Sequence, residues 1–154
     1  MLFPSVKWFQ ALCDAANANP ERFRHLGTVD LVLVAKIDYP NQSSFFEIVF
    51  SGYHCAGVRE LPAVGAAQKG AVVLEGSSEV WREMIANIKA NGQADLAHTL
   101  NTLTLYDTPM RVWSENQLDT DLFYRYQQNL QEFFDTSARF ETEFAGPEAA
   151  PAYH

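Results

Sequence analysis

The chain has 154 residues, 47% of them hydrophobic, and its 11 Phe, 6 Tyr and 3 Trp supply enough apolar volume for one folded core. Its 19 acidic and 11 basic residues give a net charge of −8, which argues against nucleic acid or an anionic lipid surface as a partner. No stretch approaches the ~20 apolar residues of a membrane span, and the first residues lack a basic leader. The composition therefore predicts one soluble, cytoplasmic domain without stable membrane insertion.

The two cysteines, Cys13 and Cys55, are too far apart in the sequence to suggest a metal pair. Two cysteines in a chain of this size are typical of ordinary buried thiols in a reducing compartment. The sequence also contains no cluster of metal ligands, no Gly-rich phosphate loop and no nucleophile motif. It therefore predicts no metal, no cofactor and no catalytic residue.

The first third of the chain predicts two short helices and then a three-stranded meander. The first helix begins at Pro4 or Ser5, and the second runs from Asn19 to Gly27, because Asn is a favourable cap and Pro suits the first helical position. Residues 29–37 then alternate, which indicates a strand with one apolar face. Strands over 45–50 and 53–58 are separated by a Ser-Gly turn, so the three strands should be antiparallel.

After a flexible crossing at 61–70, a short strand over 71–74 leads into a helix that is capped near Ser77. Val80, Trp81, Met84, Ile85 and Ile88 form an apolar stripe on this helix. Asn91-Gly92 is typical of a left-handed helix end. A further short helix is expected from Asp95, followed by a last hairpin made of residues 102–106 and 110–113.

The final element is predicted to be one long helix over 118–134. It carries a wide apolar stripe with polar residues between its members: Leu118, Leu122, Phe123, Tyr126, Leu130, Phe133 and Phe134. Residues 145–154 have no periodicity and should form a disordered tail. We therefore expect a single domain over residues 1–144.

The order of these elements resembles the sterol carrier protein family. The resemblance runs from about residue 3 to 135. It is carried by the N-terminal helix, the meander, the passage through Gly76-Ser77-Ser78 into the Trp81 helix, and the segment from Ala94 to Leu100 leading to Leu103 and Leu105. These motifs are diffuse apolar patterns with no invariant chemical signature. The segment after Leu105 departs from the best-known members, and the C-terminal Ala-Tyr-His is not a peroxisomal signal, so ligand identity and compartment do not transfer.

The resemblance implies an α+β fold in which a curved antiparallel sheet of about five strands carries helices on one face. It also implies an apolar tunnel between the two layers for a fatty acid, an acyl thioester or a sterol-like molecule, in a monomer or weak homodimer. We expect the tunnel wall to consist of residues from the sheet, the two striped helices and the segment between them: Leu33, Phe45, Ile48, Phe50, Trp81, Met84, Ile85, Ile88, Leu100, Leu103, Met110, Phe123, Tyr126, Leu130 and Phe133.

Three other interpretations compete with this one. Apolar residues at helical spacing are often no more than core packing. A small hydratase or isomerase on a similar α+β fold would use Glu47 or His54 as a base, if these side chains faced each other across the meander. A non-catalytic interaction module would instead dock a partner or a second copy on an exposed part of a stripe.

Overall fold

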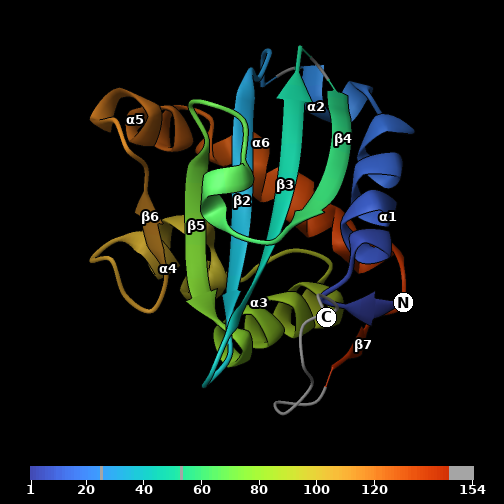
Figure 1. Ribbon diagram of the computed structural model, residues 1–154. Coiled ribbons are helices and arrows are strands. Elements are labelled where there is room, and N and C mark those ends of the chain that lie inside the picture. The colour runs from blue at the N-terminus through green and yellow to red at the C-terminus, as the bar shows by residue number, and fades with distance from the viewer. Residues whose placement is uncertain (25, 53, 146–154) are drawn as a thin grey trace.

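The computed structural model describes residues 1–24, 26–52 and 54–145. Its centre is a five-stranded sheet in the order β4-β3-β2-β5-β6 (Figure 1). The strands are β2 (Leu31–Asp38), β3 (Ser43–Ser51), β4 (His54–Leu61), β5 (Val72–Ser77) and β6 (Arg111–Trp113). β2, β3 and β4 form the predicted antiparallel meander, in which Leu33 lies opposite Ile48 and Ile48 opposite Val58.

The prediction of a wholly antiparallel sheet is wrong, because β5 runs parallel to β2. β4 already runs in the same direction as β2, and residues 62–71 carry the chain back across the outer face of the sheet before β5 begins. This crossing contains a 3-10 turn, η1 (Val64–Ala66). The open edge of β2 is therefore filled by a strand that starts at the same end as β2, and the sheet is mixed.

The helices and the remaining short elements follow the predicted order closely in the N-terminal half and less closely after residue 95. The helices are α1 (Val6–Asn17), α2 (Glu21–Arg24), α3 (Ser78–Asn91), α4 (Leu100–Thr104), α5 (Gln117–Arg125) and α6 (Gln127–Asp135). The 3-10 turns η2 (Leu96–His98) and η3 (Thr136–Arg139) and the parallel pair β1 (Leu2–Phe3) and β7 (Glu143–Phe144) complete the described elements.

Local sequence explains where the first and third helices begin and end. The Ser5 side chain accepts a hydrogen bond from the Trp8 N–H at the start of α1, and Ser77 accepts one from the Val80 N–H at the start of α3. Gly92 ends α3 with φ +79°, a conformation that only glycine adopts without a steric penalty. The predicted start of the first helix at Pro4 or Ser5, the cap near Ser77 and the left-handed end at Asn91-Gly92 are confirmed.

The predicted C-terminal hairpin and single long helix are both wrong. Residues 100–104 form α4, because Thr99 caps a helical turn there and the Thr104 hydroxyl donates to the Leu100 carbonyl. Of the supposed hairpin, only β6 is a strand, and it pairs with β5. The long helix is interrupted at Tyr126 (φ −99°, ψ 14°), since α5 packs against β5 and β6 whereas α6 packs against α1, α2 and α4.

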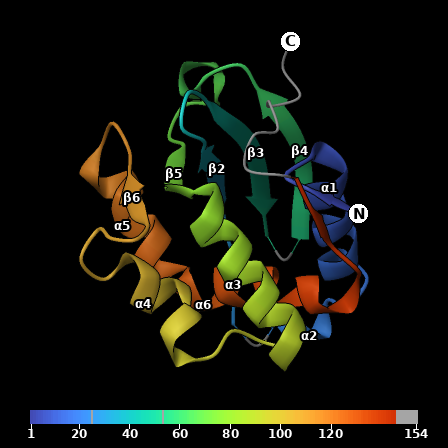
Figure 2. The same cartoon turned by 90° about the horizontal axis from the view of Figure 1, so that it is seen from below.

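The main helices cover one face of the sheet. Figure 2 shows α1, α3 and α6 together on this side, with α1 beside β4 and α3 beneath β2 and β5. The large core lies between these helices and the sheet, and a smaller core of Val34, Leu61 and Val73 lies under the 62–71 crossing on the other face. The alternation predicted for β2 is confirmed, since Leu31, Leu33, Ala35 and Ile37 belong to the large core and Val34 to the small one.

The described helices are all too short or too polar to cross a bilayer. The expected tail over 145–154 lies outside the described residues except for Ala145. Tyr53, where the third strand was expected to begin, also lies outside them.

Candidate ligand site

The α3 stripe faces the sheet as predicted. Trp81, Met84, Ile85 and Ile88 are at most 1% exposed, and the Trp81 indole N–H donates to the Lys36 carbonyl of β2 over 3.1 Å. This hydrogen bond lets a large amphipathic ring pack against the strand without burying an unpaired donor. α3 is therefore firmly docked on β2.

The second stripe is divided between α5 and α6. Phe123, Leu130, Phe133 and Phe134 are buried, whereas Leu118 is 71% exposed because α5 lies at the margin of the sheet. Among the fifteen expected wall residues, all except Phe45, Phe50 and Tyr126 are buried, and these three are half-buried.

One expected wall residue lies on the wrong face of the sheet. Phe45 and Ile48 lie on opposite faces of β3. Phe45 packs with Val34, Leu61 and Val73 under the 62–71 crossing. The sheet separates this cluster from the helices, because neighbouring strand residues point to opposite faces. Phe45 therefore does not border the space beneath α3 and α6.

Side chains fill most of the space in which the tunnel was expected. Phe133 packs edge-on against Phe50 with ring centres 4.9 Å apart, and Trp81 lies 5.9 Å from Phe134. A small, partly open pocket of about 30 Å³ lies at one end of this layer, which is room for roughly one or two water molecules. Its wall comes from α1, α6 and the strand ends: Ala16, Asn17, Gly27, Val29, Phe50, Gly52, His54, Cys55, Asn129, Leu130 and Phe133.

Three of the pocket residues, Phe50, Leu130 and Phe133, were predicted as wall residues, and the other eight were missed. Most of the missed residues are small or polar, and they come together only because the end of α1 meets the turn between β3 and β4. Helical or strand periodicity carries no signal for such a meeting. The apolar residues of α6 could be predicted because they repeat every three or four positions.

The α1 side of the pocket is covalently fixed. Cys13 and Cys55 form a disulfide with a Cα–Cα distance of 5.4 Å, so the prediction of two free thiols is wrong. The number of cysteines says nothing about which of them meet: these two are 42 positions apart, but the packing of α1 on β4 brings them into contact. The Asn17 side chain adds two hydrogen bonds of 2.9 Å, donating to the Cys55 carbonyl and accepting from the Cys55 N–H.

The α6 side of the pocket has no covalent link to the strands. Asn129 donates to the Gly27 carbonyl over 3.2 Å, and Tyr126 provides no side-chain cap for the first turn of α6. This wall consists otherwise of apolar packing by Leu130 and Phe133.

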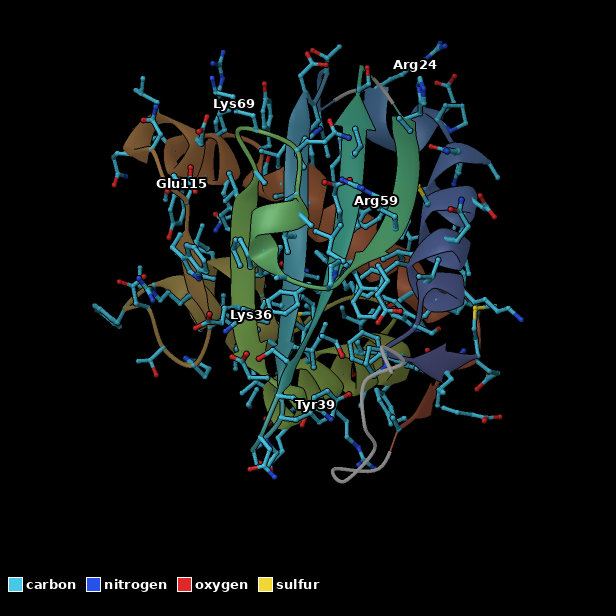
Figure 3. All side chains as sticks on the ribbon, in the orientation of Figure 1. Arg24, Lys36, Tyr39, Arg59, Lys69 and Glu115 are labelled. Atoms are coloured by element: carbon cyan, nitrogen blue, oxygen red, sulfur yellow. A yellow bond between two sulfur atoms is a disulfide. The ribbon has the colours of Figure 1, made fainter. Side chains whose placement is uncertain are left out.

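Glu47 and His54 do not face each other. Glu47 is 1% exposed on the outer face of the sheet and lines an open groove of about 330 Å³, whereas His54 lines the smaller pocket beside α1 and α6. Arg59, which lies across β3 and β4 in Figure 3, donates to the Glu47 carboxylate from Nε (2.7 Å) and Nη2 (3.2 Å). The Gln68 N–H donates a third bond over 2.8 Å.

These bonds decide the charge of Glu47. Burial by itself raises the pKa of a carboxyl group, but the hydrogen bonds and charge of Arg59 and the Gln68 N–H outweigh it, so the pKa of Glu47 is lowered. Arg59 also donates to the Ala66 carbonyl over 3.1 Å. The pair therefore clamps the 62–71 crossing onto the sheet, and a carboxylate engaged in this way is a poor general base.

His98 lies in a surface cluster away from the pocket. Its Nδ1 is 2.6 Å from Asp95 Oδ1 and its Nε2 is 3.2 Å from Glu83 Oε1. The hydrogen bond to Asp95 is the main reason that the pKa of His98 is raised, and it lowers the pKa of Asp95 in turn. Within the residues that the structure describes, no group of three His, Cys, Asp or Glu side chains is placed to hold a metal ion.

No protein-family model matches the sequence, and no curated protein sequence matches it significantly. Two solved structures match the fold. One is a crystal structure of sterol carrier protein 2, with a TM-score of 0.66 and 12% identity over 89% of this chain and 98% of that one. The other is a solution structure of a conserved hypothetical protein of Thermus thermophilus, described as possibly a sterol carrier protein, with a TM-score of 0.65 and 14% identity over 90% of both chains. The chain therefore has the fold of sterol carrier protein 2.

Proposed function

We propose that the protein binds and carries one hydrophobic molecule, such as a fatty acid, an acyl thioester or a sterol-like compound, and that it does so without catalysis. The observation that carries this proposal is the pocket with the apolar wall of Phe50, Leu130 and Phe133. It lies at the margin of the large core, in a fold shared with sterol carrier protein 2. The other expected wall residues, except Phe45, would line the deeper part of the bound state.

A ligand of this kind needs far more space than the pocket offers. Small-molecule sites usually enclose about 300–1,000 Å³, so the proposal requires an opening of the layer between α6 and the sheet. α6 is the wall expected to move, because a disulfide and two hydrogen bonds fix α1 to β4. Each methylene removed from water contributes ~0.8 kcal/mol, which supplies the driving force for the opening.

A cytoplasmic location and a monomeric or weakly dimeric state remain predictions. The disulfide between Cys13 and Cys55 removes the thiol argument for a reducing compartment, because disulfides persist mainly in oxidising environments. The enzyme alternative loses support from the separation of Glu47 and His54 onto two different sites.

Native mass spectrometry of protein purified without delipidation tests the proposal, because a bound lipid and the oligomeric state appear in one spectrum. Thermal unfolding with palmitate and with cholesterol is the quantitative measurement. A ligand at a hundredfold excess over its Kd stabilises a fold by ~2.7 kcal/mol. A ligand-free spectrum together with an unchanged melting temperature for both compounds would contradict the proposal.

A pair of matched variants locates the site. Ala16 lies in the pocket wall, so Ala16→Met should fill the pocket and weaken binding of palmitate by about tenfold or more, the equivalent of ~1.4 kcal/mol. Ala18 is exposed two residues further along and receives the same change as the control. Equal affinities in the two variants would show that the ligand enters elsewhere.

A further inference from the structure

The Cys13–Cys55 disulfide joins the two elements that form one wall of the pocket. Cys13 lies in the third turn of α1 and is 0% exposed, and Cys55 lies at the start of β4 and is 5% exposed. Their Cα–Cα distance of 5.4 Å falls within the range of ordinary disulfides, about 4.4–6.8 Å. Both residues belong to the large core.

The two cysteines differ in their relation to the pocket. Cys55 lines it together with Gly52 and His54, whereas Cys13 does not. The disulfide therefore holds the Cys55 sulfur toward α1. Asn17 fixes the Cys55 backbone independently through its two hydrogen bonds, so the backbone of Cys55 stays in place when the covalent bond is absent.

Reduction changes what the two sulfur atoms can do. Bonded sulfurs are about 2.05 Å apart, whereas non-bonded heavy atoms need a separation of about 3.5–4.0 Å. Cys13 is fully packed, so the Cys55 side chain is the one with space to move, and the adjacent space is the pocket of about 30 Å³. Once the bond is broken, the Cys55 sulfur is free to rotate about χ1 among staggered rotamers, and the pocket is the space next to it.

We propose that the Cys13–Cys55 pair is a redox gate of the ligand site: the disulfide keeps the pocket open, and the free Cys55 thiol closes it. This inference rests on the proposed lipid-binding function. In the closing reaction, one thiolate of a thiol reductant such as glutathione attacks Cys55 and displaces the Cys13 thiolate. A second thiolate then attacks the mixed disulfide, leaving two protein thiols, once protonated, and one oxidised glutathione.

Thermodynamic linkage makes the gate reciprocal. A ligand that binds the oxidised form more tightly must stabilise the disulfide against reduction by the same factor. Access adds a kinetic effect: Cys13 is 0% exposed and Cys55 lines the pocket, so a ligand in the pocket would cover the sulfur that the reductant must reach. Linkage therefore predicts that bound ligand makes the disulfide harder to reduce at equilibrium, and access predicts that it slows reduction.

The experiment compares oxidised and reduced wild-type protein with two single variants, using fluorescent NBD-stearate as the probe. Cys13→Ala keeps a free thiol at the pocket, whereas Cys55→Ala has no sulfur there, and both variants lose the same covalent link. We expect oxidised protein to bind at least about tenfold more tightly than reduced protein, within the usual range of coupling between sites. Cys13→Ala should resemble reduced protein, and Cys55→Ala should bind more tightly than Cys13→Ala.

Further readouts use the wild-type chain and do not depend on the variants folding. Thiol titration of unfolded protein purified without reductant should detect no free thiol, and saturating NBD-stearate should slow reduction by dithiothreitol. Free thiols in that titration, equal affinities in both redox states, or tighter binding after reduction would overturn the gate. Equal weakening in Cys13→Ala and Cys55→Ala would also overturn it, because loss of the link alone would then explain the effect. If oxidised protein binds neither NBD-stearate nor NBD-cholesterol, the proposed function fails and the gate fails with it.

Discussion

Substitution of Leu130 tests whether α6 is the wall of a ligand site or ordinary core. Its side chain is 0% exposed and borders the pocket. Leu130→Ala removes three carbon groups at ~0.8 kcal/mol each, so the loss of burial alone costs about 2.4 kcal/mol. Because the new space joins a pocket whose surface is already partly unpacked, we expect little additional cavity penalty and a total loss of about 2–3 kcal/mol.

Leu74 in β5 is the matched control. It is also 0% exposed, but it lies within the large core and does not line the pocket. A Leu→Ala change that leaves an empty hole costs up to about 5 kcal/mol, so Leu74→Ala should cost about 3–5 kcal/mol.

Urea unfolding measures both losses, and binding of fatty acids of increasing chain length measures the second effect. Leu130→Ala should shift the preference toward longer or bulkier ligands, whereas Leu74→Ala should lower stability without such a shift. If Leu130→Ala costs as much as Leu74→Ala and leaves the chain-length preference unchanged, the reasoning is refuted and Leu130 is plain core.

Three further predictions concern the scaffold. Gly92→Ala should cost about 1–2 kcal/mol in urea unfolding, because φ +79° places Cβ against the following carbonyl; an unchanged midpoint would contradict this. Arg59→Leu should cost about 1–3 kcal/mol at neutral pH by leaving the Glu47 carboxylate buried with fewer donors. Since the folded-state pKa of Glu47 lies below its ordinary 4.5, this contribution is present above that pH and is lost as the pH falls through the folded value. The urea curves of the two proteins should therefore converge in acid, and a constant gap would argue against the ion pair. NMR titration should find the His98 pKa above 6.5 and closer to 6.5 in Asp95→Asn, with the stabilisation from His98 present below pH 6.5 and lost as the pH rises through the folded pKa.

Local patterns in the sequence determined the elements whose energetics are local. A helix cap or a strand face depends on residues within a few positions. The sequence could therefore predict the helix start at Ser5, the Ser77 cap, the left-handed Gly92 and the alternation along β2. The α+β class and the resemblance to sterol carrier proteins followed from the order of such elements.

Other features could not be predicted from local patterns, because they depend on which other helix or strand an element packs against. The stripe over 118–134 reads as one helix, yet it breaks at Tyr126 because α5 and α6 pack on different neighbours. Residues 102–106 alternate like a strand, yet Thr99 caps a helix that covers the first three of them. β5 pairs in parallel with β2 because of where the 62–71 crossing delivers the chain.

In the candidate site, too, some residues could be predicted from local patterns and others could not. The apolar members Phe50, Leu130 and Phe133 could be predicted, since burial imposes a period on a helix or strand. Cys13 and Cys55 could not be paired, because their 42-residue separation closes only when α1 packs on β4. Sequence therefore determined which side chains are apolar and which helices bury them, whereas only long-range packing decided that small and polar residues from separate segments meet in one pocket.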